Sequence, residues 1–345
     1  TAEIDFTTSN GGDDSLTTYS WVVTGDDIGL PSTGAGSISE LVTNSTNDIL
    51  TATIEVTPTY TNAGESCSGP SETFTITVSP TAQVEGIDPI VVCNGDDIAD
   101  IVFSTANENG TTIYSWTNDN TIIGLAASDT GDITTFEANN DTNDPITATI
   151  TVTPSYDTTP LLACTGDPIT FTITVNPTAQ VDDPLDYEYC NGDTAVIDFT
   201  TSNGGVDSVT TYSWAVTGDD IGLPTEGIDN ISELVTNSTN DILTATITVT
   251  PTYTNDGEPC TGPSEEFTIT VSPTAQVEQV EDIVVCNGDE VTDIVFTTTS
   301  ENDIVYSWSI DTEIGTQSLT GIGNIQLFEA DNDTNDPIVA TVTVT

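Results

Sequence analysis

The tripeptide Tyr212-Ser213-Trp214 lies in an alternating segment, residues 211–217, in which the two aromatic side chains and Val216 share one face. Period-two alternation is typical of a β-strand with one buried face. The same tripeptide occurs four times along the chain. Its copies contain all the tryptophans of the sequence, which are Trp21, Trp116, Trp214 and Trp308. We therefore predict that each Trp is the central core residue of a half-buried strand.

The sequence is a tandem repeat with a period of about one hundred residues. Residues 1–85 align without a gap to residues 194–278, whereas Cys93 and Cys190 begin a looser similarity at an offset of 97 (190 − 93). The pattern is A-B-A-B. The predicted modules are 1–84 (A, without its first strand), 85–181 (B), 182–277 (A) and 278–345 (B, without its last strand).

Each module is predicted to be an all-β immunoglobulin-like sandwich. In the third module, alternating segments at 195–199, 211–217, 243–250 and 267–271 are separated by turns rich in Gly, Asn and Asp. No window has helical periodicity, and short strands with frequent turns around a single core Trp are typical of this fold. The junctions at 79–82, 176–179 and 272–275 are short and contain Pro. Because such linkers restrict bending, we expect the tandem modules to form an extended rod.

The charge of the chain excludes several partners. It contains 56 Asp and Glu but no Lys, Arg or His, so its net charge is −56. Binding of nucleic acids and of anionic membranes requires cationic side chains, and a membrane span requires about 18 or more apolar residues in a row. The sequence has neither. Because Thr1 aligns inside a module, we expect an internal segment of a longer protein, with any export signal or anchor outside it.

The cysteines allow two kinds of disulfide pairing. They are Cys67, Cys93, Cys164, Cys190, Cys260 and Cys286. Pairing of sequence neighbours (67–93, 164–190, 260–286) would link adjacent modules. Pairing within modules (93–164, 190–260) would tie the first strand to the loop before the last strand, and would leave Cys67 and Cys286 with partners outside the sequence. We favour the second, since closing a loop of about 70 residues contributes about 4 kcal/mol in the chain-entropy model. Either pairing indicates an oxidising, extracytoplasmic compartment.

Five motifs of the second module together resemble a known family. They are Val-Cys-Asn-Gly-Asp (92–96), Tyr-Ser-Trp (114–116), Thr-Ala-Thr-Ile-Thr-Val-Thr-Pro (147–154), Cys-Thr-Gly (164–166) and Phe-Thr-Ile-Thr-Val-Asn-Pro-Thr-Ala (171–179). This combination is similar to the PKD-like, Ig-type repeats of giant surface proteins in gliding and biofilm-forming Gram-negative bacteria. The resemblance implies β-sandwiches with a disulfide inside each module, export to the cell surface, and a role as stalk, adhesin or fibre. The absence of Lys and Arg departs from the family pattern.

Acidic and amide residues gather in one turn of each B module, at 137–144 and 329–336. Carboxylate and amide oxygens are the ligands that calcium prefers, so the turn is a candidate calcium site. Its candidate ligands are Asp141, Asp144, Asp331, Asp333 and Asp336. Acidic linker residues are an alternative site, and solvated turn residues are the alternative without any ion.

The same turn contains a possible acceptor for N-linked glycans in every module, because the sequence Asn-x-Ser/Thr occurs there. The acceptors are Asn44, Asn140, Asn237 and Asn332. Asp-Ser pairs such as Asp14-Ser15 and Asp207-Ser208 are alternative acceptors for O-linked sugars.

These features predict an extracellular, cell-surface structural protein that forms a fibre or filament, or the stalk of an adhesin. Its predicted partners are neighbouring chains of the same kind, with surface glycans as an additional ligand class. The alternative is a calcium-dependent carbohydrate-binding array that uses the loops at Asp26-Asp27 and Asp219-Asp220. The sequence contains no recognisable catalytic constellation, and we expect no enzymatic activity and no cofactor other than calcium.

Overall fold

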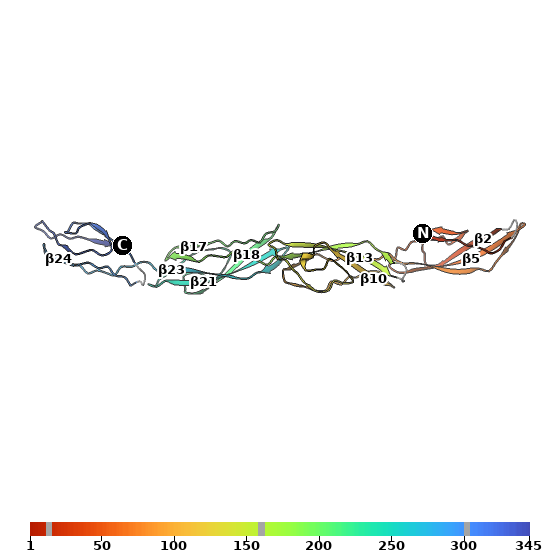
Figure 1. Cartoon of the computed structure of the whole chain (residues 1–345), viewed down its shortest axis with the longest axis horizontal. Coiled ribbons are helices and arrows are strands. Elements are labelled where there is room, and N and C mark those ends of the chain that lie inside the picture. The colour runs from red at the N-terminus through yellow and green to blue at the C-terminus, as the bar shows by residue number, and fades with distance from the viewer. Residues whose placement is uncertain (12–15, 158–162, 300–303) are drawn as a thin grey trace. The chain divides into compact units, whose positions relative to one another are not determined.

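The computed structural model describes residues 1–11, 16–157, 163–299 and 304–345 (Figure 1). The protein is all-β and consists of tandem immunoglobulin-like sandwich modules, as the sequence predicts. Within the described ranges, helical structure is limited to one 3-10 turn, Thr121–Ile123. The chain forms two compact units. The first contains residues 1–178 together with 204–208 and 254–260, and the second contains 179–203, 209–253 and 261–345.

The first unit contains two sandwiches. In the first module, β1 (Ala2–Ile4) pairs with β4 (Ile38–Glu40), and the larger sheet consists of β3 (Thr33–Ala35), β2 (Leu16–Gly25), β5 (Leu50–Asn62), β6 (Glu65–Ser68) and β7 (Glu72–Val78). In the second module, β9 (Asp97–Ile98) pairs with β12 (Phe136–Glu137). The larger sheet has the order β11 (Ser128–Thr130), β10 (Thr111–Asn118), β13 (Ile146–Asp157), β15 (Ile169–Asn176) and β8 (Ile90–Cys93), and β14 (Ala163–Thr165) also pairs with β13.

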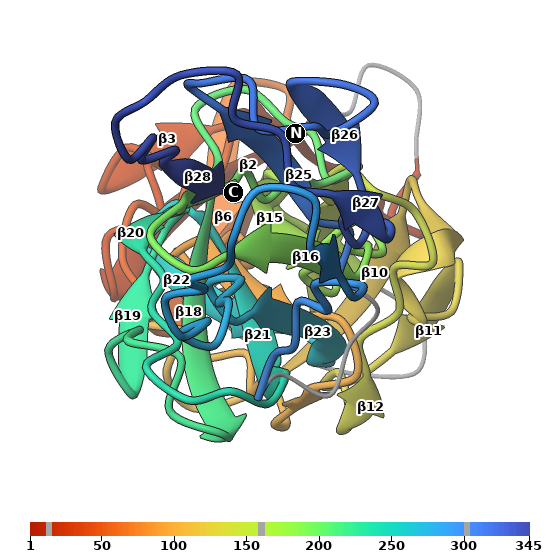
Figure 2. The same cartoon turned by 90° about the vertical axis from the view of Figure 1, so that its left-hand side faces the viewer.

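The third module repeats this arrangement. Its larger sheet has the order β16 (Tyr187–Cys190), β23 (Glu265–Ser272), β21 (Leu243–Asn255), β18 (Val209–Gly218) and β19 (Glu226–Ile228), with β22 (Glu258–Thr261) also on β21, and β17 (Thr194–Ile197) pairs with β20 (Ile231–Leu234). Strands β21 and β23 lie side by side in both cartoon views (Figures 1 and 2). In the fourth module, β26 (Thr320–Ile322), β25 (Ser307–Ile310) and β28 (Val342–Val344) form one sheet, and β24 (Glu290–Val291) pairs with β27 (Phe328–Glu329).

The described residues form four separate hydrophobic cores; Val84 packs on the second core and Val181 belongs to the third, although the predicted boundaries place each in the preceding module. The tryptophans have the predicted role: Trp21, Trp116 and Trp214 are buried, with 4 to 6% of their surface exposed, whereas Trp308 packs against the fourth core but is only partly buried. The second and third cores are the most enclosed because β8 and β16 pair in parallel with β15 and β23. Among the described residues, no strand covers the corresponding edge of β7 in the first module.

The central strand of each of the first three modules is longer than the strand that pairs with its first seven residues. In β21, residues 243–249 pair with β23, and the remainder of the strand pairs with β22 to form a hairpin. Strand β13 likewise pairs with β15 through its first seven residues (146–152) and with β14 through 155–157. Strand β5 follows the same pattern with β7 and β6. Each of these three modules therefore carries a hairpin that extends past the end of β7, β15 or β23 within the larger sheet.

In the second and third modules, the base of the hairpin lies against the linker that precedes the module. The Gly262 amide donates to the Pro251 carbonyl at 3.1 Å, and a Cβ atom at Gly262 would lie 1.8 Å from the carbonyl oxygen of Ala179. Ala179 is fully buried. In the second module, a Cβ atom at Gly166 would likewise lie 1.8 Å from the carbonyl oxygen of Ala82. Glycine is thus required in the Cys-Thr-Gly motif because two backbone segments make contact there.

We expect Gly262→Ala to destabilise the third module by about 1–3 kcal/mol, because the clash involves backbone that cannot rotate away. The matched control is Gly86→Ala, since a Cβ at Gly86 meets no atom within 4 Å. Urea unfolding followed by Trp fluorescence and by calorimetry measures both variants. An unfolding curve for Gly262→Ala that coincides with that of the control would contradict the contact.

Candidate functional site

The disulfide of the described structure connects two modules. Cys93, at the end of β8 in the second module, is bonded to Cys260 on β22 in the third module, with 5.5 Å between their Cα atoms. Cys67, Cys164, Cys190 and Cys286 are free. The predicted bonds 93–164 and 190–260 are therefore wrong, and so are the alternative bonds between sequence neighbours. Both bonded residues and the loops around them belong to the first unit.

The register of the second module explains why its own two cysteines do not pair. Cys93 lies opposite Asn176, and the residue before Asn176, Val175, pairs with Ile146 at the start of β13. Cys164 instead pairs with Tyr156, at another level of β13. These levels are ten residues apart on β13 (156 − 146), which corresponds to about 33 Å along a strand. A disulfide requires Cα atoms within about 7 Å. The two cysteines of one module therefore lie at opposite ends of its sheet.

The turn that follows β8 fixes the position of Cys93. The Asp96 carboxylate accepts the Cys93 amide at 2.9 Å, and Gly95 adopts a positive φ of 85° while donating its amide to the Ala138 carbonyl. The Asn94 side-chain oxygen accepts the Asn140 amide at 2.7 Å. The sequence Cys-Asn-Gly-Asp therefore forms a turn whose hydrogen bonds connect the first strand to the turn at residues 140–144.

Asn140 closes that turn through its side chain. Its Nδ2 donates to the carbonyls of Asp144 and Val175 at 2.9 and 2.7 Å, and its Oδ1 accepts the amide and hydroxyl of Thr142. Asn140 is 1% exposed, and its counterpart Asn237 is 2% exposed with the same bonds. Neither has an amide hydrogen free for a sugar in the folded chain.

The remaining glycan acceptors have similar roles. Asn44 and Asn332 are half-buried, and their Nδ2 atoms donate to the Asp48 and Asp336 carbonyls. Of the Asp-Ser pairs, Asp14-Ser15 lies outside the described residues, whereas the Ser208 hydroxyl donates to nearby backbone carbonyls. Glycosylation at these positions stays a prediction.

Two loops of the third module, 204–208 and 254–260, lie against the end of the second module within the first unit. Asn255 donates its Nδ2 to the side-chain oxygen of Asn176 at 2.9 Å, and Asn176 donates to the Asn255 carbonyl at 3.4 Å. Both are buried, with 0% of Asn176 and 8% of Asn255 exposed. The Gly204 amide also donates to the Asn143 carbonyl at 2.9 Å. Near the disulfide there are therefore also a buried, hydrogen-bonded pair of Asn side chains and a backbone–backbone hydrogen bond.

A related junction connects the first and second modules. Here Glu108 donates its amide to the Asn47 carbonyl at 2.8 Å, and Asn109 donates its side-chain amide to the Asp48 carboxylate at 2.6 Å. The Tyr156 hydroxyl donates to the Glu108 carbonyl at 2.6 Å. Burial, with the Asp48 carboxylate nearby, raises the pKa of Tyr156 above its ordinary value.

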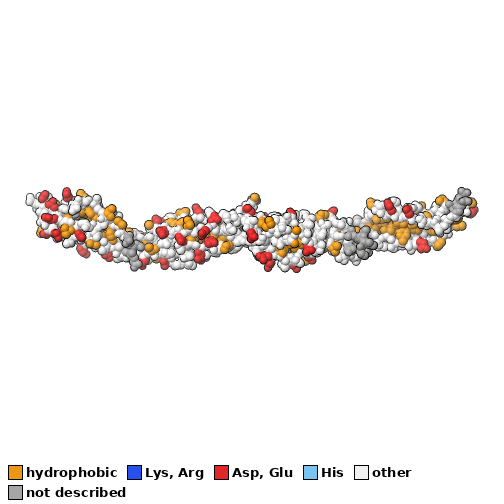
Figure 3. All heavy atoms as spheres, in the orientation of Figure 1, with side chains coloured by type: hydrophobic (Ala, Val, Ile, Leu, Met, Phe, Trp, Pro, Cys, Tyr) orange, Lys and Arg blue, Asp and Glu red, His pale blue; other side chains and the backbone are white. Residues whose placement is uncertain are grey.

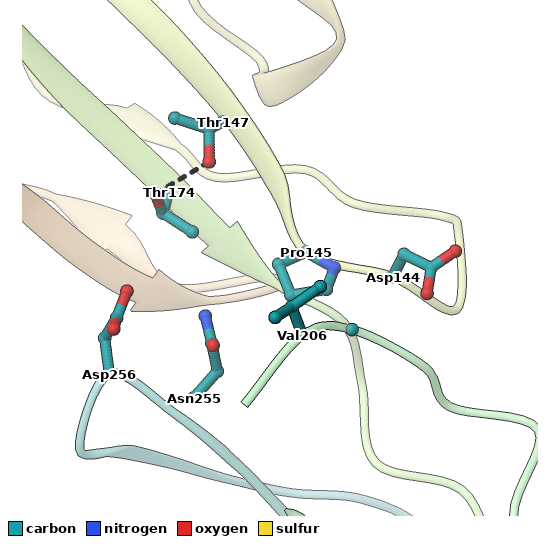
Figure 4. Close-up of a pocket in the computed structure, with 8 residues that line it drawn as sticks. Asp144, Pro145, Thr147, Thr174, Val206, Asn255 and Asp256 are labelled. Carbon is teal, nitrogen blue, oxygen red and sulfur yellow. Dashed lines mark hydrogen bonds between the residues drawn. The ribbon is translucent and has the colours of Figure 1, made fainter. Parts of the chain in front are cut away.

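An open hollow of about 470 Å³ borders the disulfide-linked junction. Asp144, Pro145, Val206, Asn255 and Asp256 contribute to its lining (Figure 4). In Figure 4 the carboxylates of Asp144 and Asp256 stand on opposite sides of Pro145 and Val206, so they do not converge on one ion. Within the described ranges, no group of three or more His, Cys, Asp and Glu side chains is placed to hold a metal. The predicted calcium ligands Asp141, Asp144, Asp331, Asp333 and Asp336 are exposed, and calcium binding there stays a prediction.

The loops of the carbohydrate-binding alternative use their acidic side chains internally. The Asp26 carboxylate accepts the Thr51 amide at 2.7 Å, and Asp27 accepts the Gly29 amide at 3.0 Å. Asp219 and Asp220 make the equivalent bonds in the third module. These carboxylates therefore stabilise turns. On the face drawn in Figure 3, acidic side chains are scattered among uncharged atoms on both units.

Sequence reasoning missed the Asn176–Asn255 pair and the staggered disulfide. The available signal was the unusual length of the alternation from 243 to 255, which exceeds that of the neighbouring strands and indicates an overhang. Without the positions of the strand ends, the overhang does not reveal which module it reaches.

Comparisons with known proteins give only distant likenesses. No family model matches the chain, and no curated protein sequence matches it. Three similar solved structures are the N-terminal domains of the outer capsid protein Hoc of bacteriophage RB49 (TM-score 0.39, 15% identity, covering 77% of this chain and 92% of that one), Drosophila N-cadherin EC1-4 (0.28, 13%, 99% and 91%) and chicken CNTN1 FN1-FN3 (0.26, 12%, 79% and 96%). At these TM-scores nothing about function follows. In the part of the chain that the structure describes, no helix is long and apolar enough to cross a membrane.

We expect removal of the Cys93–Cys260 bond to lower the free energy of unfolding substantially. A separation of 167 residues corresponds to about 5 kcal/mol in the chain-entropy model. Urea unfolding of the oxidised chain, of the reduced chain and of the Cys93→Ser/Cys260→Ser variant measures the loss. The control is Cys67→Ser/Cys286→Ser, which removes two free thiols and should unfold like the wild type. The assignment would be contradicted if reduction left the unfolding curve unchanged.

We expect Asn140→Ala to destabilise the second module by about 1–3 kcal/mol, because buried backbone carbonyls lose their donor. The matched control is Asn332→Ala, which removes equivalent bonds from a half-buried site and should cost less. Thermal unfolding measures the difference, and intact-mass spectrometry of the native protein checks the acceptor. A glycan on Asn140 would show that this turn is open in the native protein.

Proposed function

We propose that the chain is a load-bearing structural segment of an extracellular surface protein, serving in a fibre or in the stalk of an adhesin. The observation that carries this proposal is the disulfide between successive modules. A covalent bond from β8 of one sandwich to the hairpin of the next couples the two modules mechanically, which independent domains do not require. Its persistence requires an oxidising compartment, which supports a location outside the cytoplasm.

The disulfide changes the path of tension along the chain. A force applied to the two ends would pass from Cys93 directly to Cys260, so the residues between them would not carry it. These residues include most of the cores of the second and third modules, whereas β8 and β23 lie outside the bonded loop. The bond would therefore keep tension off most of the second and third sandwiches, in addition to its contribution to their thermodynamic stability.

The surface composition supports a structural role in another way. A net charge of −56 without cationic side chains disfavours nonspecific adhesion of one chain to another and to nucleic acid. Specific contacts must then come from hydrogen bonds, apolar surface and disulfides. The buried junction in the first unit uses hydrogen bonds and a disulfide.

Single-molecule force spectroscopy of the 345-residue chain, held by its two ends, tests the proposal. Unfolding the oxidised chain should release less length than unfolding the reduced chain. The difference should be about 57 nm, from a separation of 167 residues at about 3.4 Å per residue. The Cys93→Ser/Cys260→Ser variant should match the reduced chain, and Cys67→Ser/Cys286→Ser should match the oxidised one. Equal lengths before and after reduction would remove the support for a load-bearing role.

A further inference from the structure

We propose that Asn109-Gly110 is a site of spontaneous deamidation, and that the change from amide to carboxylate at Asn109 loosens the contact between the first and second modules. The site consists of Asn109, the glycine that follows it, and Asp48 of the first module, all within the first unit. The reaction consumes only water. The coupling of the two modules thereby depends on the age of the molecule, in addition to any structural role.

Asn followed by Gly is prone to deamidation, because glycine has no side chain that hinders the approach of its backbone nitrogen to the amide carbon of Asn. Pairs of this kind recur along the sequence. They begin at Asn10, Asn94, Asn109, Asn191, Asn203 and Asn287. The folded structure makes these pairs unequal.

Four of the pairs are protected by backbone hydrogen bonds. Their glycine amides donate to backbone carbonyls at 2.8 to 3.0 Å; these glycines are Gly95, Gly192, Gly204 and Gly288. The side-chain oxygens of the preceding Asn residues also accept backbone amides, at 2.6 to 2.8 Å. Neither reacting group can move toward the other until the turn opens, so deamidation there is limited by local unfolding.

Asn109 and Gly110 lack this protection. Both residues are exposed, and Asn109 adopts a positive φ of 54° in the turn before β10. The Asn109 side chain is held through Nδ2, which donates to the Asp48 carboxylate at 2.6 Å. Among the described residues, neither the Gly110 amide nor the Asn109 side-chain oxygen has a hydrogen-bond partner. The nucleophilic nitrogen is therefore available without any opening of the fold.

The reaction begins when the Gly110 nitrogen loses its proton to hydroxide and attacks Cγ of Asn109. The bond from Cγ to Nδ2 breaks, and ammonia leaves after taking a proton from water. Water then opens the resulting five-membered succinimide. Opening at the side-chain carbonyl gives aspartate, whereas opening at the backbone carbonyl gives isoaspartate. In total one water is consumed and one ammonia is released, without an oxidant or a reductant.

The product cannot make the contact that the amide makes. A carboxylate at position 109 replaces the donor of the Asp48 contact with a second anion, and like charges at this range repel each other. The chain contains no Lys, Arg or His that could neutralise the pair. Isoaspartate also lengthens the backbone beside Gly110, where a Cβ atom would lie 2.1 Å from the hydroxyl oxygen of Tyr156.

The neighbouring bonds of the first junction depend on the same short segment. Glu108, directly before Asn109, donates its amide to Asn47 and accepts the Tyr156 hydroxyl. The equivalent backbone bond of the second junction, from Gly204 to Asn143, is accompanied by a disulfide and a buried Asn pair. The contacts described at the first junction are hydrogen bonds. Deamidation at Asn109 is therefore expected to release this junction and to leave the second one intact.

The first test is to age the full, oxidised chain in weakly alkaline buffer and to measure amide loss at each Asn by mass spectrometry. Pepsin is the protease, because the chain has no Lys or Arg for trypsin and acid stops further deamidation. Asn109 is expected to lose its amide at least about tenfold faster than Asn94, Asn191 and Asn287, whose turns must open first. An Asn109 amide that survives as long as those three would overturn the assignment of the site.

The second test introduces the product charge directly through Asn109→Asp. Hydrogen exchange of the Glu108 amide, resolved to single residues by electron-transfer fragmentation, reports whether the bond to Asn47 is intact. The control Asn10→Asp makes the same change of charge at another exposed Asn-Gly pair. The double variant Asp48→Asn/Asn109→Asp keeps the net charge of the wild type and leaves only one carboxylate in the contact.

Exchange at Glu108 is expected to be at least about tenfold faster in Asn109→Asp than in the wild type, because the closed junction is disfavoured by repulsion. Asn10→Asp should exchange at the wild-type rate, and Asp48→Asn/Asn109→Asp should return toward it. Wild-type exchange in Asn109→Asp would overturn the proposed release of the junction. An equal effect of Asn10→Asp, or a double variant as fast as Asn109→Asp, would overturn it as well.

Discussion

The structure depends on a central strand that is longer than the strand that pairs with its first seven residues. In β21, seven residues pair with β23 on one edge and β22 pairs further along the strand, while β18 pairs with the other edge. Beyond the end of β23, the short strand β22 takes its place beside β21, and residues outside this sheet contact the end of the hairpin. In the first unit, those contacts come from Asn176 and Cys93. The overhang thus determines where the disulfide forms and which module it joins.

The absence of cationic side chains explains the chemistry of the junction. A carboxylate buried there could not be neutralised by an ion pair within the chain, and its desolvation would be costly. Neutral amides avoid this cost because each supplies both donors and an acceptor. Asn140 and the Asn176–Asn255 pair are accordingly buried, whereas the predicted calcium ligands remain at the surface. Contacts of this type also depend little on salt, in contrast to surface ion pairs.

The sequence predicted the fold well because the signals are local. Alternation, turn residues and one Trp per module specify strands and cores, and Trp116 and Trp214 occupy the predicted central positions. The disulfide was not predictable from the same signals. Its partners are 167 residues apart, and the choice depends on which end of the sheet each cysteine reaches. That follows from the parallel register of β8 with β15, which neither spacing nor composition reveals.

The alternation of A and B modules is also explained at the junction. Asn176 ends β15 in the second module, and Ser79 and Ser272 hold the corresponding position in the two A modules. All three directly follow a valine whose carbonyl accepts a hydrogen bond from the side chain of the turn Asn. Asn255, the hairpin residue that meets Asn176, belongs to an A module. A buried Asn–Asn pair can therefore form only where the hairpin of an A module reaches the end of a B module. Because the two halves of this contact lie on different modules, they retain their complementarity only if A and B are duplicated together, which is the pattern of the sequence.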